Sequence, residues 1–366
     1  RDLRMSRGLG DVYKRQGVQL FFCDVRSGRG TGGGCRNDEA GNSGDNKAYA
    51  ADRNYGRKRR GRLRKMSLKY TVIKTMFHII PMQKIMAKPY EELVKLFHTE
   101  EAKPSIPDLK DAELTFQTHT IENFPVLEIS HKKKSDYVCI YVAGGGMLKY
   151  PKPSQAKELI ALAKNTGRNM LLPYFPLAPE HDLIDALNML YATYKMALKH
   201  YPAEKIAFLG GSSGAAMVLW LMSYINRQGE GTPMPGKIAL SSPGSALTAE
   251  ERKRAEELNR TDLIMSTTAL DNIFKGMTGG KELPEELLYT SKGIYEGIKD
   301  VYLSYGGDEV FSAAAQSTAQ CLRSYGAKVT LEIAEGMYHT YAVMPFVKEA
   351  KPGNRRLVAY LTVEKQ

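Results

Sequence analysis

The chain has 366 residues, of which 43% are hydrophobic and 25% charged, an ordinary balance for a globular protein of one large or two modest domains. No apolar run approaches the roughly 18 residues of a membrane span, and none resembles the core of a secretory signal, so we expect a cytoplasmic protein without stable membrane insertion. The net charge of +12 lies mostly in residues 1–65, which hold 17 Lys and Arg against 7 Asp and Glu, so we expect no nucleic-acid partner for the folded body.

Residues 1–65 are rich in glycine and end in a basic block at residues 57–65. They carry too little apolar surface to offset the entropy lost on ordering, so we expect them to be disordered. Residues 1–16 resemble translated sequencing-adaptor sequence, in which case the segment is not native and Met66 is the natural start. The alternative is a basic arm that binds nucleic acid or anionic lipid.

Residues 66–112 have apolar residues at helical spacing, interrupted by Pro81 and Pro89. We expect two or three short amphipathic helices in this segment. Such helices can lie on a membrane, but they more often cover a neighbouring apolar surface, and we favour a lid over a pocket.

Residues 113–366 alternate strand-like and helix-like segments. The predicted strands are Leu114–His119, Val126–Ser130, Tyr137–Val142, Met170–Tyr174, Lys205–Leu209, Lys237–Ser241, Asp300–Tyr305 and Val329–Ile333. The predicted helices are Leu183–His200, Ala215–Arg227 and Ser312–Tyr325. This order predicts an α/β domain with a mostly parallel central sheet flanked by helices, in which the first two strands can form an antiparallel edge. Residues 246–298 interrupt this alternation of strands and helices with a charged helical insertion, which we interpret as a second lid element.

A Gly-x-Ser-x-Gly string, residues 210–214, lies between a predicted strand and a predicted helix. The string alone is weak evidence, but in this position it predicts a tight turn that exposes the hydroxyl of Ser212 at the edge of the sheet. The N-terminus of the following helix favours developing negative charge. We therefore expect Ser212 to be a nucleophile.

Three glycines, residues 144–146, follow another predicted strand. Their backbone can approach a ligand closely and present N–H groups to it. Acyl transfer needs such donors where the oxyanion forms, and we assign the N–H groups of Gly145, Gly146 and Ser213 to this oxyanion hole. Taken alone, the glycine run is equally typical of an ordinary loop.

A serine nucleophile needs a base and an orienting carboxylate. Among the seven histidines, His339 alone follows the nucleophile in the chain, just beyond the last predicted strand. Asp308 and Glu309 both follow the preceding strand and its Gly306-Gly307 turn. Only one of these two carboxylates is expected to face His339.

Together these residues resemble the hormone-sensitive-lipase-like branch of the α/β-hydrolases, of the Abhydrolase-3 type, from about Met66 to the C-terminus. The most specific element, residues 174–181, is similar to the family's Tyr-Arg-Leu-Ala-Pro-Glu-His string. In the family, the catalytic carboxylate is usually followed two positions later by a bulky apolar residue. It also stands seventeen positions before the glycine that ends the following helix. Glu309 meets both conditions, through Phe311 and Gly326, so the resemblance favours it over the alternative acid, Asp308.

Two departures from the family's pattern are present. Ala143 replaces the histidine of its His-Gly-Gly-Gly loop, so the loop lacks a side chain that could anchor it. Gly211 replaces the aspartate of its Gly-Asp-Ser-Ala-Gly-Gly motif. Neither change removes a reacting group.

The resemblance implies a serine carboxylesterase that hydrolyses small, acetyl-like esters without a cofactor. An amidase or peptidase with the same machinery is the nearest rival. A binding module of the same fold is the other alternative, which the presence of Ser212, His339 and two candidate acids disfavours. The four cysteines are too few and too scattered for a disulfide scaffold or a zinc site, so we expect no metal. A homodimer is compatible with the sequence.

Overall fold

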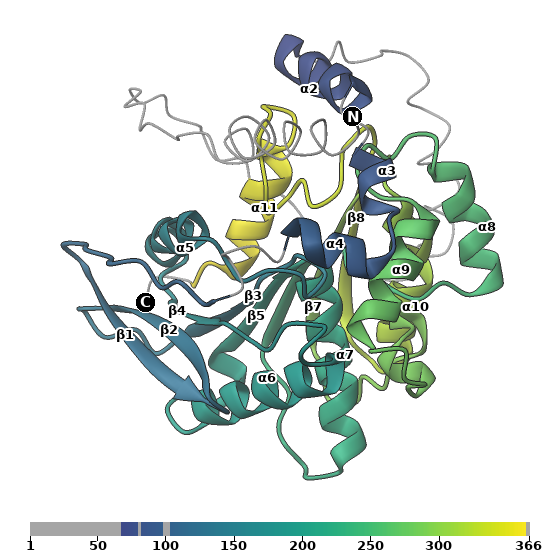
Figure 1. The fold of residues 1–366 in the computed structure, drawn as a ribbon. Coiled ribbons are helices and arrows are strands. Elements are labelled where there is room, and N and C mark those ends of the chain that lie inside the picture. Colours follow the sequence, from purple (N-terminus) through teal and green to yellow (C-terminus); the bar gives the residue numbers. More distant parts are fainter. Residues whose placement is uncertain (1–66, 80–81, 98–102, 364–366) are drawn as a thin grey trace, which may run out of the picture.

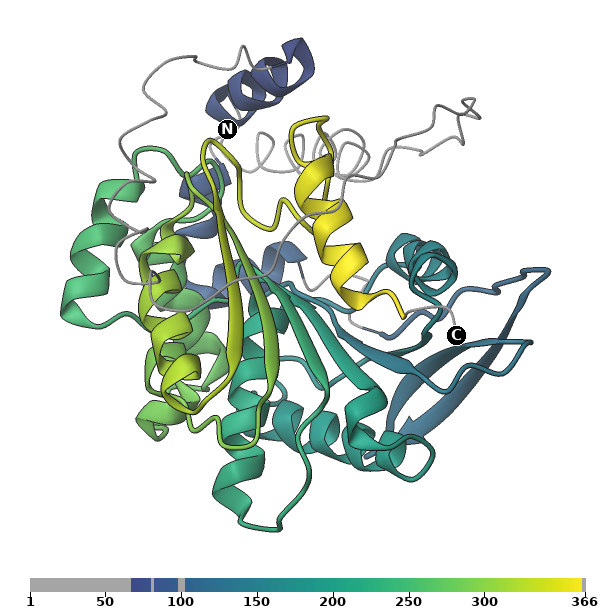
Figure 2. The same cartoon turned by 180° about the vertical axis from the view of Figure 1, so that it is seen from behind.

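The computed structural model describes residues 67–79, 82–97 and 103–363. The predicted disordered tail, residues 1–65, lies outside these ranges. The described residues form a central sheet with helices on both faces (Figures 1 and 2). This is the predicted fold class.

The sheet has the strand order β1-β2-β4-β3-β5-β6-β7-β8. Its strands are β1 Leu114–Ile121, β2 Phe124–His131, β3 Val138–Val142, β4 Asn169–Pro173, β5 Ile206–Gly211, β6 Lys237–Ser241, β7 Asp300–Gly306 and β8 Lys328–Ala334. Strand β2 pairs antiparallel with both β1 and β4, whereas the remaining neighbours are parallel. All eight predicted strands and the antiparallel edge are therefore confirmed.

Helices α6, α7 and α10 pack on one face of the sheet, and α5 and α11 pack on the other. Their bounds are α5 Pro153–Thr166, α6 Leu183–Leu198, α7 Ser213–Gln228, α10 Ala315–Ser324 and α11 Lys351–Leu361. Helix α7 is buried on nearly all sides, because its first eleven residues are all covered. It is the central helix of the domain and begins beside the predicted nucleophile.

Helices α5 and α11 were not among the predicted helices. Each starts next to a proline, at Pro153 and at Pro352, and such starts are equally typical of turns. The signal that was missed is the apolar spacing that follows. In α11 the buried residues Gly353, Leu357 and Leu361 recur every four positions, which is the pattern of a one-sided helix.

Five further α-helices lie outside this layered core (Figure 1). They are α2 Leu68–Ile79, α3 Met82–Met86, α4 Tyr90–Phe97, α8 Ala249–Leu258 and α9 Thr267–Met277. We call these five helices and the α8–α9 loop the cap. They come from the two segments predicted as lid elements, residues 66–112 and 246–298.

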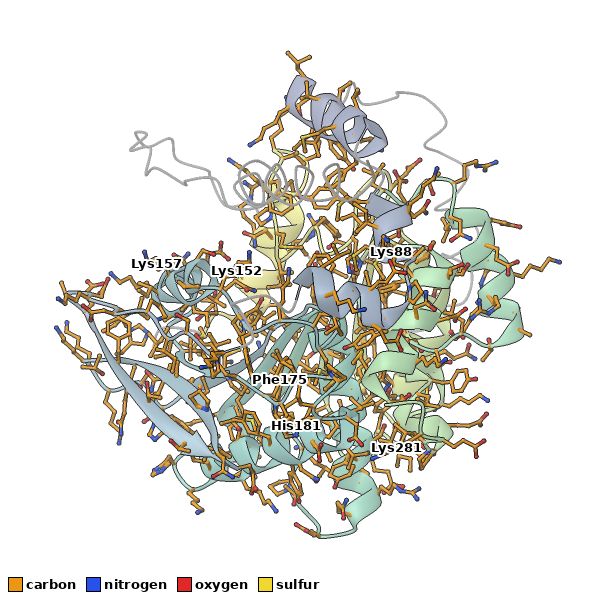
Figure 3. The ribbon with its side chains drawn as sticks, viewed as in Figure 1. Lys88, Lys152, Lys157, Phe175, His181 and Lys281 are labelled. Carbon is orange, nitrogen blue, oxygen red and sulfur yellow. The ribbon has the colours of Figure 1, made fainter. Side chains whose placement is uncertain are left out.

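Side-chain amides hold the two halves of the cap together. Gln83 on α3 donates from Nε2 to the carbonyl oxygens of Asn259 (2.7 Å) and Met265 (2.8 Å). Asn272 on α9 donates from Nδ2 to the carbonyl oxygens of Ala87 (2.9 Å) and Lys88 (3.0 Å), immediately before α4; Lys88 is labelled in Figure 3. These bonds join residues more than 170 positions apart and so tie α3 and the residues before α4 to the end of α8, the α8–α9 loop and α9.

Candidate active site

Ser212 occupies the turn between β5 and α7, as the glycine–serine string predicts. Its φ of 55° is a conformation that L-residues rarely adopt. Gly214 is required beside it, because a Cβ at that position would lie 2.1 Å from the carbonyl oxygen of Val142. The turn therefore holds the serine in a strained conformation at the carboxyl edge of the parallel strands, where its side chain lines a cavity.

His339 lies in the loop after β8 and directs its ring at Ser212. Nε2 of His339 is 2.8 Å from Oγ of Ser212, within hydrogen-bonding distance. The edge-to-face packing of Phe311 against the imidazole, with ring centroids 4.6 Å apart, restricts its orientation. His339 is only 6% exposed, so its ring is largely shielded from solvent.

Glu309, and not Asp308, is the carboxylate that faces the imidazole. Oε2 of Glu309 is hydrogen-bonded to Nδ1 of His339, and the Glu309 side chain is completely buried. Oε1 accepts a hydrogen bond from the backbone N–H of Gly306 at 2.7 Å. Asp308 instead points to the cap, where Lys74 of α2 lies 3.0 Å from Oδ2.

Ser242 is a residue of this site that the sequence analysis missed. Its hydroxyl donates to Oε1 of Glu309 (2.7 Å) and accepts the backbone N–H of Thr340 (2.8 Å), so it links the carboxylate to the loop that carries His339. The register of the sheet explains this placement: Gly211 pairs with Ser241, and therefore Ser212 and Ser242 leave the sheet side by side. The available signal was a serine just beyond the end of the strand next to β5.

Backbone strain also concentrates here. Ser242 has φ 54° and Thr340 has φ 60°, close to the value of Ser212. Such residues cost free energy and persist where the surrounding structure determines them, most often at functional sites.

The three assigned oxyanion donors differ in their availability. Gly145 and Gly146 follow β3, and both line the cavity with Ser213. The N–H of Gly146 is occupied, because it donates to Oγ of Ser213 at 2.8 Å. The N–H groups of Gly145 and Ser213 have no hydrogen-bond partner within the described ranges. Two of the three assigned N–H groups are therefore open to an incoming oxygen in this structure.

A second buried carboxylate, Asp262, lies close to the site and was also missed. It belongs to the α8–α9 loop, is 7% exposed, and accepts three backbone N–H groups: Ile264 (2.8 Å) and Met265 (2.9 Å) at Oδ1, and Val310 (2.9 Å) at Oδ2. Burial raises the pKa of Asp262 to about 6, although these hydrogen bonds and the charge of His339 act in the opposite direction. Asp262 thus fastens the cap to the residue that follows Glu309.

A cavity of 260 Å³ opens at Ser212 and His339. Its walls are mostly apolar and come from the sheet edge, from α7 and from both halves of the cap. The cap contributes Met82, Met86, Phe97, Ile264, Met265, Leu270, Ile273, Phe274 and Met277. A few polar side chains, including Tyr141, Gln155 and Glu158, line it as well. The site can therefore hold a small, largely apolar group next to a hydrogen-bonded serine.

The described residues form neither a metal-binding cluster nor a membrane-spanning helix. No cluster of three or more His, Cys, Asp or Glu side chains there could hold a metal ion. Among the helices of the described part, none is long and apolar enough to cross a membrane.

The sheet, the serine turn between strand and helix, and the Ser–Glu–His order along the chain define the class of the α/β-hydrolases. The Abhydrolase_3 family, described as alpha/beta hydrolase fold, matches residues 139–343, more than half of the chain. The chain belongs to this family.

Similar proteins agree with this assignment. An acetyl-hydrolase of Streptomyces hygroscopicus is 23% identical over 203 residues, which are 55% of this chain and 67% of that protein. The structure of an esterase from the bacterial hormone-sensitive lipase (HSL) family has a TM-score of 0.64 at 21% identity, covering 78% of this chain and 96% of that one. The structure of a hormone-sensitive lipase from a metagenome library has a TM-score of 0.63 at 19% identity, covering 80% of this chain and 97% of that one. The predicted membership of the α/β-hydrolases of the Abhydrolase-3 type is therefore confirmed, and the two solved structures share this fold.

Proposed function

We propose that the chain is a serine carboxylesterase that hydrolyses small esters with short, acetyl-like acyl groups through an acyl-enzyme intermediate. The observation that carries this proposal is the hydrogen-bonded series Ser212, His339 and Glu309 at the wall of an apolar cavity. The similarity to an acetyl-hydrolase supports a short acyl group.

In the proposed reaction, Oγ of Ser212 attacks the ester carbon while its proton passes to Nε2 of His339. Glu309 remains ionised and stabilises the imidazolium that forms. When the tetrahedral intermediate collapses, the carbon–oxygen bond to the alcohol breaks and His339 returns the proton to the leaving oxygen. A water molecule then repeats the same sequence on the acyl-enzyme, which releases the carboxylic acid and restores Ser212.

The negative oxygen of the tetrahedral intermediate needs donors beside Ser212. The free N–H groups of Gly145 and Ser213 are the candidates, and the N-terminus of α7 adds a favourable field. In a largely buried site such donors stabilise charge more strongly than they would in water.

The size of the cavity favours small substrates. Its 260 Å³ lies below the range of about 300–1,000 Å³ that is typical of pockets for drug-sized ligands. We therefore expect the rate of hydrolysis to fall steeply as the acyl chain lengthens from acetate or butyrate.

The test is a series of p-nitrophenyl esters, from acetate to laurate, hydrolysed by the wild type, by Ser212→Ala and by Ser223→Ala. Ser223 is a matched control because it is a buried serine on the same helix whose hydroxyl accepts the backbone N–H of Ile294, away from the cavity. Loss of the nucleophile should reduce kcat by about six orders of magnitude. Ser223→Ala should retain kcat within a few-fold.

Substantial hydrolysis by Ser212→Ala would show that the nucleophile lies elsewhere. Faster cleavage of the matching p-nitroanilides than of the esters would favour the amidase alternative. Binding of esters without turnover by the wild type would favour the binding-module alternative.

A further inference from the structure

We propose that Tyr90, on cap helix α4, is a positioning residue for the oxyanion loop, so that packing of the cap controls the rate of the chemical step. This inference rests on the proposed function of the site. Tyr90 does not line the cavity, so its action on the reaction passes through the backbone that it holds.

The contact is a buried hydrogen bond. The hydroxyl of Tyr90 donates to the carbonyl oxygen of Gly146 at 3.2 Å, and the Tyr90 side chain is 5% exposed. Burial raises the pKa of Tyr90 well above its ordinary value, so the hydroxyl keeps its proton and remains a donor across the physiological range. Gly146 is held on its other side by Ser213, through the bond to its N–H.

The loop needs such restraints because its backbone is in an unfavourable conformation. Gly145, Gly146 and Met147 have consecutive positive φ values of 130°, 64° and 56°. At Met147 this conformation is sterically unfavourable, because the residue has a side chain. The N–H of Gly145, one of the two open donors, lies in this run. A small rotation of the loop would turn that N–H away from the oxyanion.

The second half of the cap fixes the ring of Tyr90. A Cβ on Gly276 of α9 would lie 2.1–2.3 Å from three ring atoms of Tyr90, so the ring packs directly on the helix backbone at the one position that has no side chain. Ile273, one turn earlier on α9, approaches Gly146 itself: a Cβ there would be 3.2 Å from its Cγ2. Residues of helices α4 and α9 therefore both contact Gly146.

The test compares Tyr90→Phe with Tyr295→Phe. Tyr295 is the matched control, because it is also buried and donates its hydroxyl to a backbone carbonyl, that of Thr290 at 2.8 Å, without lining the cavity. We expect Tyr90→Phe to lower kcat for p-nitrophenyl acetate by about tenfold to a hundredfold, with KM changed less than twofold. Affinity for a boronic acid that forms a tetrahedral adduct should fall in the same proportion, and Tyr295→Phe should match the wild type in both measurements.

A second variant, Gly276→Ala, displaces the same ring without changing Tyr90. It should lower kcat in the same way, with an unchanged circular dichroism spectrum. Hydrogen exchange of the peptide that contains residues 144–148 gives a readout independent of hydrolysis, and should be faster in both variants than in Tyr295→Phe.

Wild-type kcat and unchanged exchange in Tyr90→Phe would overturn the inference. So would an equal loss of kcat in Tyr295→Phe, because the effect would then be one of general stability. If the wild type hydrolyses no ester, the proposed function fails, and exchange of residues 144–148 still decides whether Tyr90 holds the loop.

Discussion

At the scale of single residues, the adjacent carboxylates Asp308 and Glu309 have different surroundings. Glu309 is fully buried against His339, whereas Asp308 is partly exposed and paired with Lys74. We predict that Glu309→Gln lowers kcat by about four orders of magnitude, as expected when the imidazole loses the carboxylate that sets its tautomer. Asp308→Asn should change kcat only slightly, because a surface ion pair contributes about 1 kcal/mol or less.

Steady-state kinetics of the two variants check this prediction. The reverse ranking would transfer the orienting role to Asp308. Two mild effects would mean that His339 is held by other contacts.

Ser242 leads to a second prediction at this scale. Its hydroxyl bonds to the carboxyl group of Glu309 and to the backbone of Thr340, and hydrogen bonds to charged groups contribute about 1.5–3 kcal/mol. Ser242→Ala should therefore lower kcat by about tenfold to a hundredfold while Ser223→Ala does not. Equal kinetics of Ser242→Ala and the wild type would show that the bond of Gly306 to Glu309 is sufficient.

Among the elements, the α8–α9 loop is tied to the turn after β7 by Asp262, and this tie should depend on pH. Its folded-state pKa of about 6 lies above the unfolded value of about 3.9, so the folded state binds the proton more tightly. The contribution of Asp262 to stability is therefore present at low pH and is lost as the pH rises from about 4 to about 6.

Urea unfolding of the wild type and of Asp262→Asn between pH 4 and pH 7 measures this contribution. The variant has no carboxyl group at this position, so the wild type should lose roughly 2 kcal/mol relative to it across that interval. A difference that does not change with pH would show that Asp262 has the same pKa in both states.

For the whole molecule, residues 66–366 are nearly balanced in charge, since they hold 35 Lys and Arg against 33 Asp and Glu. We predict that deleting residues 1–65 leaves Tm and kcat nearly unchanged, because that segment has few apolar residues with which to dock. Thermal unfolding and ester hydrolysis of the two chains check this. A large fall in Tm would contradict it, and salt-sensitive nucleic-acid binding that disappears on truncation would support the basic-arm alternative.

Local pattern was sufficient to predict most of the architecture and the turn that carries Ser212. The apolar strand segments, the turn glycines and the Gly-x-Ser-x-Gly string each depend on neighbours within a few positions, so their signals survive in a single sequence. Helices α5 and α11 were missed because a proline near the start of a segment is also typical of a turn. These helices are stabilised by packing on the sheet and on each other, which local pattern does not reveal.

The family resemblance favoured Glu309 over Asp308, but only the tertiary structure shows which of the two carboxylates faces His339. Both follow the same strand, and the direction of each side chain depends on partners such as Lys74 and His339 that are 30 or more positions away. The bond from Ser242 to Glu309, the occupation of the Gly146 N–H by Ser213 and the contact from Tyr90 to that glycine likewise join residues 56–67 positions apart. Spacing along the chain carries no information on such distances, because they are set by how the strands align and how the cap packs.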